Sequence, residues 1–434
     1  MTERGTSQRE RRHAERRFQL DVSRHLTRNF ITHLIHGMLG QTGFRLLNAP
    51  TFLPAYMLLL SGGSDVMVGL ALGLQSLGAT LTPFYGAGLV ENRPRALPVA
   101  MWVGSATRLQ VLLIAVAGLL LPTSYALATI MVALTLFGMF QGMQGVIFQF
   151  LMSKVIPVSR RGRLTGLRNF SSGITAAGVA YLGGLWFVGD NPTVTGYSYI
   201  FLLAFVLTSL GLGALLFMRE PLLPGMDGHS AREAFWPRVL AILRSNADYR
   251  RFVRARTVAT AGRLAMPFYI LYAAEHTSLT GANLAILTIA FTLAGNTSNL
   301  LWGNLADRTG YRLVILLSLG LWVLSTLALF LADGLWATSL IFVGIGAASQ
   351  GFQNAASNIV LEFGERQDVP MRLAISNSTS EAAGTLATLS GGVLASAFGY
   401  EAVFGVSLVL LVTGGLMIRR FVPEPRGRLP SART

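Results

Sequence analysis

A few charged side chains lie deep within long apolar stretches of this sequence, where a charge is costly. Glu381 is the only carboxylate well inside such a stretch and away from its ends, and it follows Arg372 by nine residues. A carboxylate that alternates between an apolar environment and an arginine neighbour can take up and release a proton. Glu381 is therefore a candidate proton carrier, and a permanent ion pair that only joins helices is the alternative.

Three arginines in similar surroundings, Arg263, Arg45 and Arg108, leave an excess of positive charge over the single Glu381. Because an arginine at such depth needs a partner, the missing partner could be the carboxylate or phosphate group of a bound solute. We expect Arg263 to be its main anchor. For Arg45 the alternative is a side chain that extends to the nearer surface, and for Arg108 it is a structural network of amides or carbonyls.

The elements that must position these residues are long and apolar. Hydrophobic residues make up 52% of the 434 residues, charged residues make up only 13%, and the mean hydropathy is +0.52. A helix needs about 20 mostly apolar residues to cross the hydrocarbon core of a bilayer. We therefore predict an all-α integral membrane protein with twelve transmembrane helices. They are expected at residues 35–60, 66–88, 97–120, 126–152, 164–188, 198–218, 252–274, 282–303, 313–332, 337–361, 373–398 and 402–418.

The net charge of +15 could indicate a nucleic-acid partner, but its distribution fits a membrane topology better. No Lys or Arg occurs in the loops near residues 61–65, 121–125, 189–197, 275–281, 333–336 and 399–401. The other loops and the two termini hold nearly all of them, and positive residues stay on the cytoplasmic side of a membrane. The sequence thus predicts a multi-pass protein of the cytoplasmic (inner) membrane, with both termini in the cytoplasm and no nucleic-acid partner.

Amide side chains within the predicted spans indicate a polar cavity, because unpaired polar groups that face lipid are costly. The sixth, ninth and twelfth spans contain no charged or amide side chain in their cores, so we expect them to face the lipid. The amides that we assign to solute binding are Gln141, Gln144, Asn296, Asn299, Gln350 and Asn354. Hydrogen bonds that only join neighbouring helices are the alternative for any single amide.

The chain also repeats at about half its length. Gln141-Gly142 recurs as Gln350-Gly351, at an offset of 209 residues (350 minus 141), and a polar linker separates the halves. We predict a basic cytoplasmic tail at residues 1–30, a six-helix bundle at 31–218, a cytoplasmic linker at 219–250, a second six-helix bundle at 251–418 and a cytoplasmic tail at 419–434. An amphipathic stretch at residues 231–243 of the linker is expected to rest on the membrane surface.

A ten-residue segment, Gly-Asn-Leu-Ala-Asp-Arg-Thr-Gly-Tyr-Arg at 303–312, follows the eighth predicted span. It resembles the cytoplasmic loop signature of the major facilitator superfamily, Gly-x-Leu-Ala-Asp-Arg-x-Gly-Arg-Arg, and departs from it only at Tyr311. In the first half the corresponding loop is degenerate: its acid survives as Glu91, but Ala87 replaces the leading glycine and Pro94 replaces the glycine of the turn. The resemblance implies a role in conformational gating for Gly303, Asp307, Arg308, Gly310, Arg312 and Glu91.

The resemblance further implies two pseudo-symmetric bundles that bind a solute between them near mid-membrane and alternate its access to the two sides. The implied function is secondary active transport of a small organic solute, coupled to a proton or another ion, by a monomer that is not an enzyme. The arginines above suggest an anionic solute. A multidrug or metabolite efflux antiporter is one alternative, although the arginine of proton-coupled members is replaced by Gly138 ahead of Gln141-Gly142. A sensor or membrane-complex assembly factor of the same fold is another.

No resident metal or cofactor is expected. The sequence contains no cysteine, and His33 and His36 lie one helical turn apart without acidic partners. There is also no phosphate-binding loop of the Gly-Lys-Ser/Thr type, which argues against ATP-driven transport by this chain.

Overall fold

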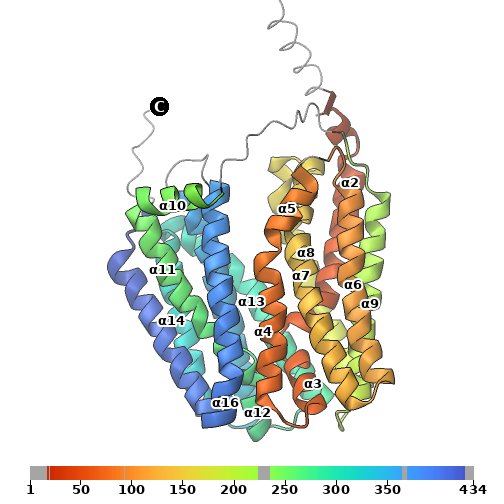
Figure 1. Ribbon diagram of the computed structural model, residues 1–434, viewed down its shortest axis with the longest axis vertical. Helices are drawn as coiled ribbons and strands as arrows, with labels where there is room; N and C mark the ends of the chain where they lie inside the picture. The colour runs from red at the N-terminus through yellow and green to blue at the C-terminus, as the bar shows by residue number, and fades with distance from the viewer. Residues whose placement is uncertain (1–16, 19, 92, 223–234, 364–368, 426–434) are drawn as a thin grey trace, which may run out of the picture.

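The computed structural model describes residues 17, 18, 20–91, 93–222, 235–363 and 369–425, and in this part of the chain every regular element is helical. Figure 1 shows two bundles side by side, one from each half of the chain. The first half contains α2 (Leu26–Asn48), α3 (Phe52–Leu60), α4 (Asp65–Leu81), α5 (Pro83–Glu91), α6 (Leu97–Leu120), α7 (Thr123–Val155), α8 (Val158–Gly183) and α9 (Val194–Ala214). The second half contains α11 (Ala247–Ala261), α12 (Phe268–His276), α13 (Gly281–Thr309), α14 (Tyr311–Leu329), α15 (Gly334–Asn358) and α16 (Val369–Phe421).

A short helix, α10 (Phe235–Ser245), precedes the second bundle and lies at its top edge in Figure 1. It covers the later part of the predicted amphipathic stretch, whose first residues lie outside the described chain. Val239 and Ile242 pack against the second bundle, whereas Leu240 is 48% exposed. We call the end of the molecule that carries α10 and the loop around Gly310 the basic end.

Nine described helical segments are long and apolar enough to cross a membrane, judged by length and composition alone. The longest of them, Met371–Phe421, is interrupted by the non-helical Gly399 (φ +82°) and covers the two last predicted spans. The first and seventh predicted spans are not among the nine. The first is broken between α2 and α3, and the seventh is broken between α11 and α12. The described chain is therefore a multi-pass helical membrane protein, and the count of twelve stays a prediction.

The first span of each half is broken at a matching place. Pro50 lies between α2 and α3, and Pro267 caps α12 after a short turn of 3₁₀ helix at Gly262–Ala265. Proline lacks an N–H group and its ring clashes with the preceding turn, so an α-helix usually ends or kinks there. Both breaks lie in the middle of a bundle. They bring Arg45, near the end of α2, and Arg263, within the turn, to a comparable depth in the two halves.

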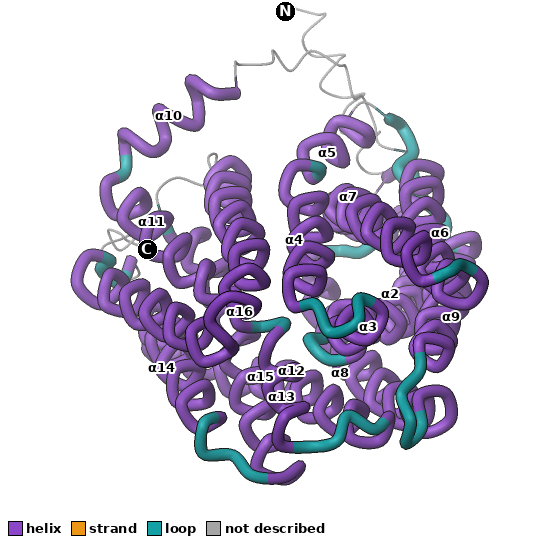
Figure 2. The backbone as a smooth tube through the Cα atoms, turned by 60° about the horizontal axis from the view of Figure 1, so that its bottom comes forward, coloured by secondary structure: helices purple, strands orange, loops and turns teal. Residues whose placement is uncertain are grey.

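The halves meet closely at the end opposite the basic end, and glycine makes this approach possible. A Cβ atom built on Gly69 of α4 would lie 2.7 Å from the Cα atom of Gly392 of α16. A Cβ atom on Gly281 of α13 would lie 1.9 Å from the carbonyl oxygen of Gly184, just after α8. The internal repeat relates these pairs, since Gly184 and Gly392 differ by 208 positions and Gly69 and Gly281 differ by 212. Figure 2 shows α4 and α16 side by side at this end.

A hydrogen bond between the halves reinforces the glycine contacts. The Tyr400 hydroxyl donates to the Asp65 carboxylate at 2.8 Å. At the basic end, by contrast, a Cβ atom built on Gly88, Gly166 or Gly303 would meet no heavy atom within 4 Å. Open space therefore surrounds these three positions. The described conformation is therefore closed at the end that carries Asp65 and more open at the basic end.

We predict that Gly392→Val opens the closed end. The added methyl groups overlap the backbone of Gly69, and overpacking of this kind costs ~1–3 kcal/mol, enough to change the ratio of closed to open molecules about tenfold. The chain contains no cysteine, so Thr388→Cys in the same background gives a single labelling site. A membrane-impermeant maleimide added at the closed end should label it faster. Gly405→Val, where a Cβ atom meets nothing within 4 Å, is the control, and equal labelling of both variants would contradict the prediction.

Candidate functional site

Two adjoining cavities lie between the bundles, and residues of both halves line each of them. Their volumes are about 310 and 430 Å³. Asn48, Ala49 and Gln141 line both, and we call the two adjoining cavities together the central cavity. A space of this size suits a small organic molecule.

The central cavity brings together most of the residues that the sequence assigned to solute binding. The smaller part is lined by Arg263, Glu381 and Gln141, and the larger part by Arg45, Gln141, Asn296, Asn299, Gln350 and Asn354. Two predicted residues, Gln144 and Arg108, do not line it. Gln144 is 7% exposed on α7, and Arg108 lies elsewhere in the first bundle.

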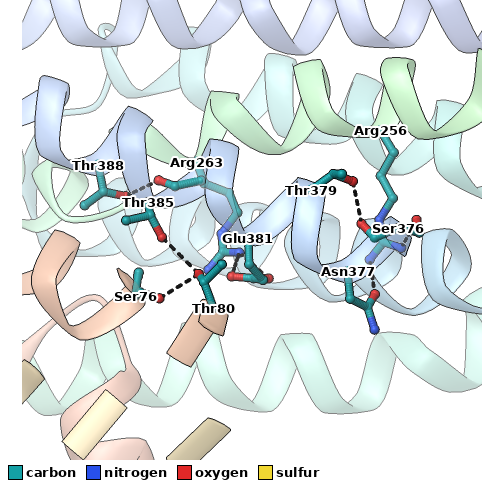
Figure 3. A network of polar contacts seen from close by, with 11 residues as sticks. Ser76, Thr80, Arg256, Arg263, Ser376, Asn377, Thr379, Glu381, Thr385 and Thr388 are labelled. Carbon is teal, nitrogen blue, oxygen red and sulfur yellow. Dashed lines mark hydrogen bonds and ion pairs between the residues drawn. The ribbon is translucent and has the colours of Figure 1, made fainter. Parts of the chain in front are cut away.

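An ion pair joins the two charged residues of the smaller part. Nη1 of Arg263 donates to both carboxylate oxygens of Glu381, at 3.1 and 3.2 Å, and each side chain keeps about a third of its surface exposed, 34% and 33% (Figure 3). Arg263, which we expected to be the main anchor of a solute anion, thus has a carboxylate partner within the protein. The sequence could not reveal the pair, because the two residues are 118 positions apart and meet only when α16 packs along α11.

A second arginine supports the same face of α16. Arg256 lies on α11, seven residues before Arg263, and is 2% exposed. It donates to Ser376 Oγ at 2.7 Å and to Asn377 Oδ1 at 3.0 Å (Figure 3). Arg372, which precedes Glu381 by nine residues, instead donates to the carbonyl oxygen of Phe363. Arg256 had not been singled out in the sequence. Its spacing of seven residues from Arg263, two helical turns, was the available signal.

Arg45 bridges the two halves in the larger part of the cavity. Its Nη2 donates to Asn296 Oδ1 at 3.0 Å, whereas Nη1 is buried without a hydrogen-bond partner. The side chain therefore points into the interface between the bundles and does not extend to the basic end. No carboxylate lines this part of the cavity.

Arg108 follows the structural alternative. It is 2% exposed, donates from Nε to the Thr208 carbonyl and from Nη1 to the Gly104 carbonyl, both at 2.7 Å, and lies over the ring of Phe44 at 5.3 Å. These contacts join α6 to α9 within the first bundle. We do not include Arg108 in the proposed binding site.

The cavity amides are arranged in pairs. Gln75 donates to Asn48 at 2.8 Å, Asn354 donates to Asn299 at 2.7 Å, and Gln41 donates to Asn169 at 3.3 Å. Each pair satisfies one donor and one acceptor, and Gln41 Oε1 also accepts from Ser172 Oγ at 2.7 Å. The remaining amide groups are available to a solute. Four of these residues, Gln41, Asn48, Gln75 and Asn169, were not assigned from the sequence. Their position inside predicted spans was the only signal, and it does not tell which side of a helix faces the cavity.

The loop at 303–312 forms a tight connection at the basic end. Gly310 adopts φ +89°, a conformation that favours glycine, and Glu424 accepts a hydrogen bond from the backbone N–H of Arg312 at 3.0 Å. The Arg312 guanidinium donates to the Arg419 carbonyl at 2.6 Å. Among the other residues assigned to gating, Gly303, Asp307 and Arg308 are exposed, and the side chain of Glu91 lies outside the described part of the chain.

The first half holds the corresponding helix start with a buried carboxylate. Glu220 accepts hydrogen bonds from the backbone N–H groups of Ala96 and Leu97, at 2.7 and 2.8 Å, where α6 begins. It also pairs with Lys154 at 2.5 Å, and both side chains are 2% exposed. Glu424 and Glu220 thus fasten equivalent helix starts in the two halves. Neither residue was identified from the sequence.

Within the described residues, no group of three His, Cys, Asp or Glu side chains could hold a metal ion. His33 is 1% exposed, and neither of its ring nitrogens has a hydrogen-bond partner. His36 contacts the Gly211 carbonyl through Nδ1 at 3.1 Å. The two rings are 6.3 Å apart in an edge-to-face arrangement.

Comparison with known proteins agrees with this architecture. The family model of the Major Facilitator Superfamily matches residues 257–434. Among solved structures, a D-xylose–proton symporter shares 13% identity at a TM-score of 0.73, covering 94% of this chain and 100% of that one. The nucleoside transporter NupG shares 13% identity at a TM-score of 0.69, covering 90% and 98% of the chains. No curated protein matches the sequence.

A third similar structure is the xylose transporter XylE from E. coli in a partially occluded inward-open conformation, with 14% identity, a TM-score of 0.69 and coverage of 94% and 100%. The fold, the internal repeat and the family match together define the class of protein. The second half of the chain matches the family model of the major facilitator superfamily, and the whole chain has the fold of these solved transporters. The match to the family model and the shared fold point to membrane transport.

We predict that Glu220→Gln destabilises the protein strongly. The change leaves Lys154 buried without a counterion, and loss of one partner of a buried ion pair costs ~3–5 kcal/mol. Thermal unfolding of the purified protein measures the effect. The control is Asp21→Asn, which breaks the partly exposed Asp21–His25 pair and should change stability by less than about 1 kcal/mol. Similar shifts for the two variants would contradict the prediction.

Proposed function

We propose that this protein is a secondary active transporter that moves a small organic solute with an anionic group across the cytoplasmic membrane, coupled to protons. The observation that carries the proposal is the Arg263–Glu381 ion pair, which lines a cavity formed by both halves and stays a third exposed. An ion pair that served only to join α11 to α16 would not need access to this space. A partly accessible pair is positioned to exchange its partners for a solute and a proton.

The coupling step follows from the chemistry of this pair. Addition of a proton to Glu381 neutralises the carboxylate and removes the partner of Arg263. The free guanidinium then binds the carboxylate or phosphate of the solute. Release of the solute restores the need for a counterion, so Glu381 loses its proton. One proton thereby moves with each bound anionic group.

Charge in the central cavity supports an anionic solute. Arg45, Arg263 and Glu381 are the charged residues that line it, and their sum is one positive charge. Arg263 already has a carboxylate partner, whereas Nη1 of Arg45 has none. While Glu381 is ionised, it neutralises Arg263, and the net positive charge of the cavity therefore lies on Arg45.

Orientation follows from the positive charges of the loops. The basic end faces the cytoplasm under the positive-inside rule, with both termini on that side. The conformation that is closed at Asp65 and Tyr400 is then the inward-facing state of an alternating-access cycle. In that state the central cavity takes up or releases solute on the cytoplasmic side.

The cavity amides favour a second candidate, a neutral solute with several hydroxyl or amide groups. The amides contributed by both halves each offer a donor and an acceptor, which suits hydroxyl groups that do the same. The similar structures include a D-xylose–proton symporter and a nucleoside transporter. In this case the ion pair would serve coupling alone.

Proteoliposomes test the proposal directly. Uptake of labelled anionic compounds, sugars and nucleosides is measured with and without an imposed pH gradient. The proposal expects an anionic compound to accumulate with the proton gradient. Accumulation of neutral compounds alone would favour the second candidate. If no compound of the panel is taken up and pull-downs find a stable protein partner, the protein is instead a sensor or assembly factor of the same fold.

Glu381→Gln should uncouple transport from protons. The amide keeps the shape of the side chain but cannot carry the proton, so accumulation driven by one pH unit, about tenfold at most, should fall to equilibration. Counterflow exchange should continue, because it needs no net proton movement. Glu401→Gln, which changes an exposed carboxylate on the same helix, is the control. Accumulation by the Glu381 variant that still follows the pH gradient would rule out this assignment.

Asp307→Asn should slow the change between inward-facing and outward-facing states. The loop resemblance assigns this exposed carboxylate to gating, and it lies at the basic end, away from the residues that line the cavity. We expect slower exchange with little change in solute affinity, measured by counterflow rate and by equilibrium binding. Asp333→Asn, at the opposite end, is the control. A loss of binding in proportion to transport would instead place Asp307 in the binding step.

A further inference from the structure

One arginine in the first bundle remains without a protein partner. Arg168 on α8 is half-buried, and no hydrogen bond or ion pair joins its guanidinium to any residue that the structure describes. Its Nε atom is fully buried without a partner. The arginines considered above all have acceptors, namely Glu381 for Arg263, two carbonyls for Arg108 and Asn296 for Arg45. Arg168 therefore carries the least compensated positive charge among them.

The Arg168 side chain packs against Gly37 of the neighbouring helix α2. A Cβ atom on Gly37 of α2 would lie 1.7 Å from Cδ and 2.2 Å from Cγ of Arg168. Only glycine at this position leaves room for the arginine side chain to cross α2. The side chain is thus fixed against the bundle and is not free to extend into solvent.

A second unsatisfied donor lies on the same side of α2. His33, one turn before Gly37, is 1% exposed and both of its ring nitrogens lack a hydrogen-bond partner. At least one ring nitrogen of a histidine carries a proton and can donate it to an acceptor. Arg168 and His33 thus present donors in one region of the bundle, and neither has an acceptor there.

This region adjoins the central cavity on the side of the basic end. Asn169, the next residue of α8, and Gln41, one turn after Gly37 on α2, both line the cavity and are hydrogen-bonded to each other. Arg168 is ten residues from the start of α8 at the basic end, which is ~15 Å along a helix. Arg45 lies one further turn beyond Gln41 on α2. Arg168 therefore lies closer to the basic end than Arg45, beside the same wall of the cavity.

From this arrangement we propose that Arg168 forms a second anion-binding position, which the carboxylate or phosphate group of the solute occupies on its way between the basic end and Arg45. An unpaired arginine at this depth is costly, and a carboxylate or phosphate matches the planar fork of its donors. His33 contributes a further N–H donor. The proposal rests on the proposed transport of an anionic solute, but anion binding at Arg168 can be tested without transport.

Arginine-specific modification of the full-length protein tests the site. Purified protein in phosphatidylcholine nanodiscs is treated with phenylglyoxal, and the modified arginines are identified by mass spectrometry. Arg168 should react, whereas Arg108 and Arg256, each 2% exposed and hydrogen-bonded, serve as unreactive internal controls. Citrate or inorganic phosphate at threefold its Kd should slow the reaction of Arg168 about fourfold. Potassium chloride at matched ionic strength and neutral sorbitol should not.

Two glycine variants and an anionic lipid distinguish a solute site from a lipid contact. Gly37→Ala should displace the Arg168 side chain and abolish the protection by citrate, whereas Gly166→Ala, on α8 in open space, should keep it. Protection by anionic phosphatidylglycerol but not by citrate or phosphate would identify a lipid contact and overturn the proposal. Equal reaction rates with and without the anions would also overturn it. Protection of Arg168 in a protein that transports no compound would leave the site standing and remove only the proposed function.

Discussion

An arginine inside an apolar bundle needs an acceptor, and this requirement organises the interior of the protein. The arginines of this protein meet the requirement with different acceptors. Arg108 takes two backbone carbonyls and becomes part of the packing between α6 and α9, whereas Arg263 takes the carboxylate of Glu381 and stays accessible from the cavity. A carbonyl cannot change its charge, but a carboxylate can lose its charge to a proton. The choice of acceptor therefore separates structural arginines from those that can take part in a transport cycle.

An irregular backbone within the bilayer is tolerated only where it is buried in protein or lines a water-filled space. The matching breaks at Pro50 and Pro267 interrupt the first span of each half at mid-depth, and Arg263 lies within the second of them. The broken spans border the central cavity in the middle of the molecule, and α4 and α16 meet at one end of it. The internal repeat thus places two equivalent helix breaks on either side of the central cavity.

Glycine allows the closed end to form without any specific chemistry. The pairs Gly69–Gly392 and Gly184–Gly281 bring backbones into direct contact, so the closure depends on shape and can be undone without breaking many polar bonds. Two hydrogen bonds between the halves, from Tyr400 to Asp65 and from the Gly281 N–H to the Gly189 carbonyl, add polar contacts that water can replace when the halves separate. The basic end is fastened differently, because Glu220 and Glu424 hold helix starts within each half and not between the halves.

The sequence by itself determined the class of fold, the apolar stretches, the repeat and the loop at Gly310, because these depend on composition and on neighbours along the chain. Eight of the residues that it assigned to binding or coupling line the central cavity, and their assigned roles stay predictions. Only the tertiary structure decided the partners. The packing of helix faces decides whether Arg263 is paired and whether Arg168 has an acceptor. Residues more than a hundred positions apart leave no periodic signal of such a contact in the sequence.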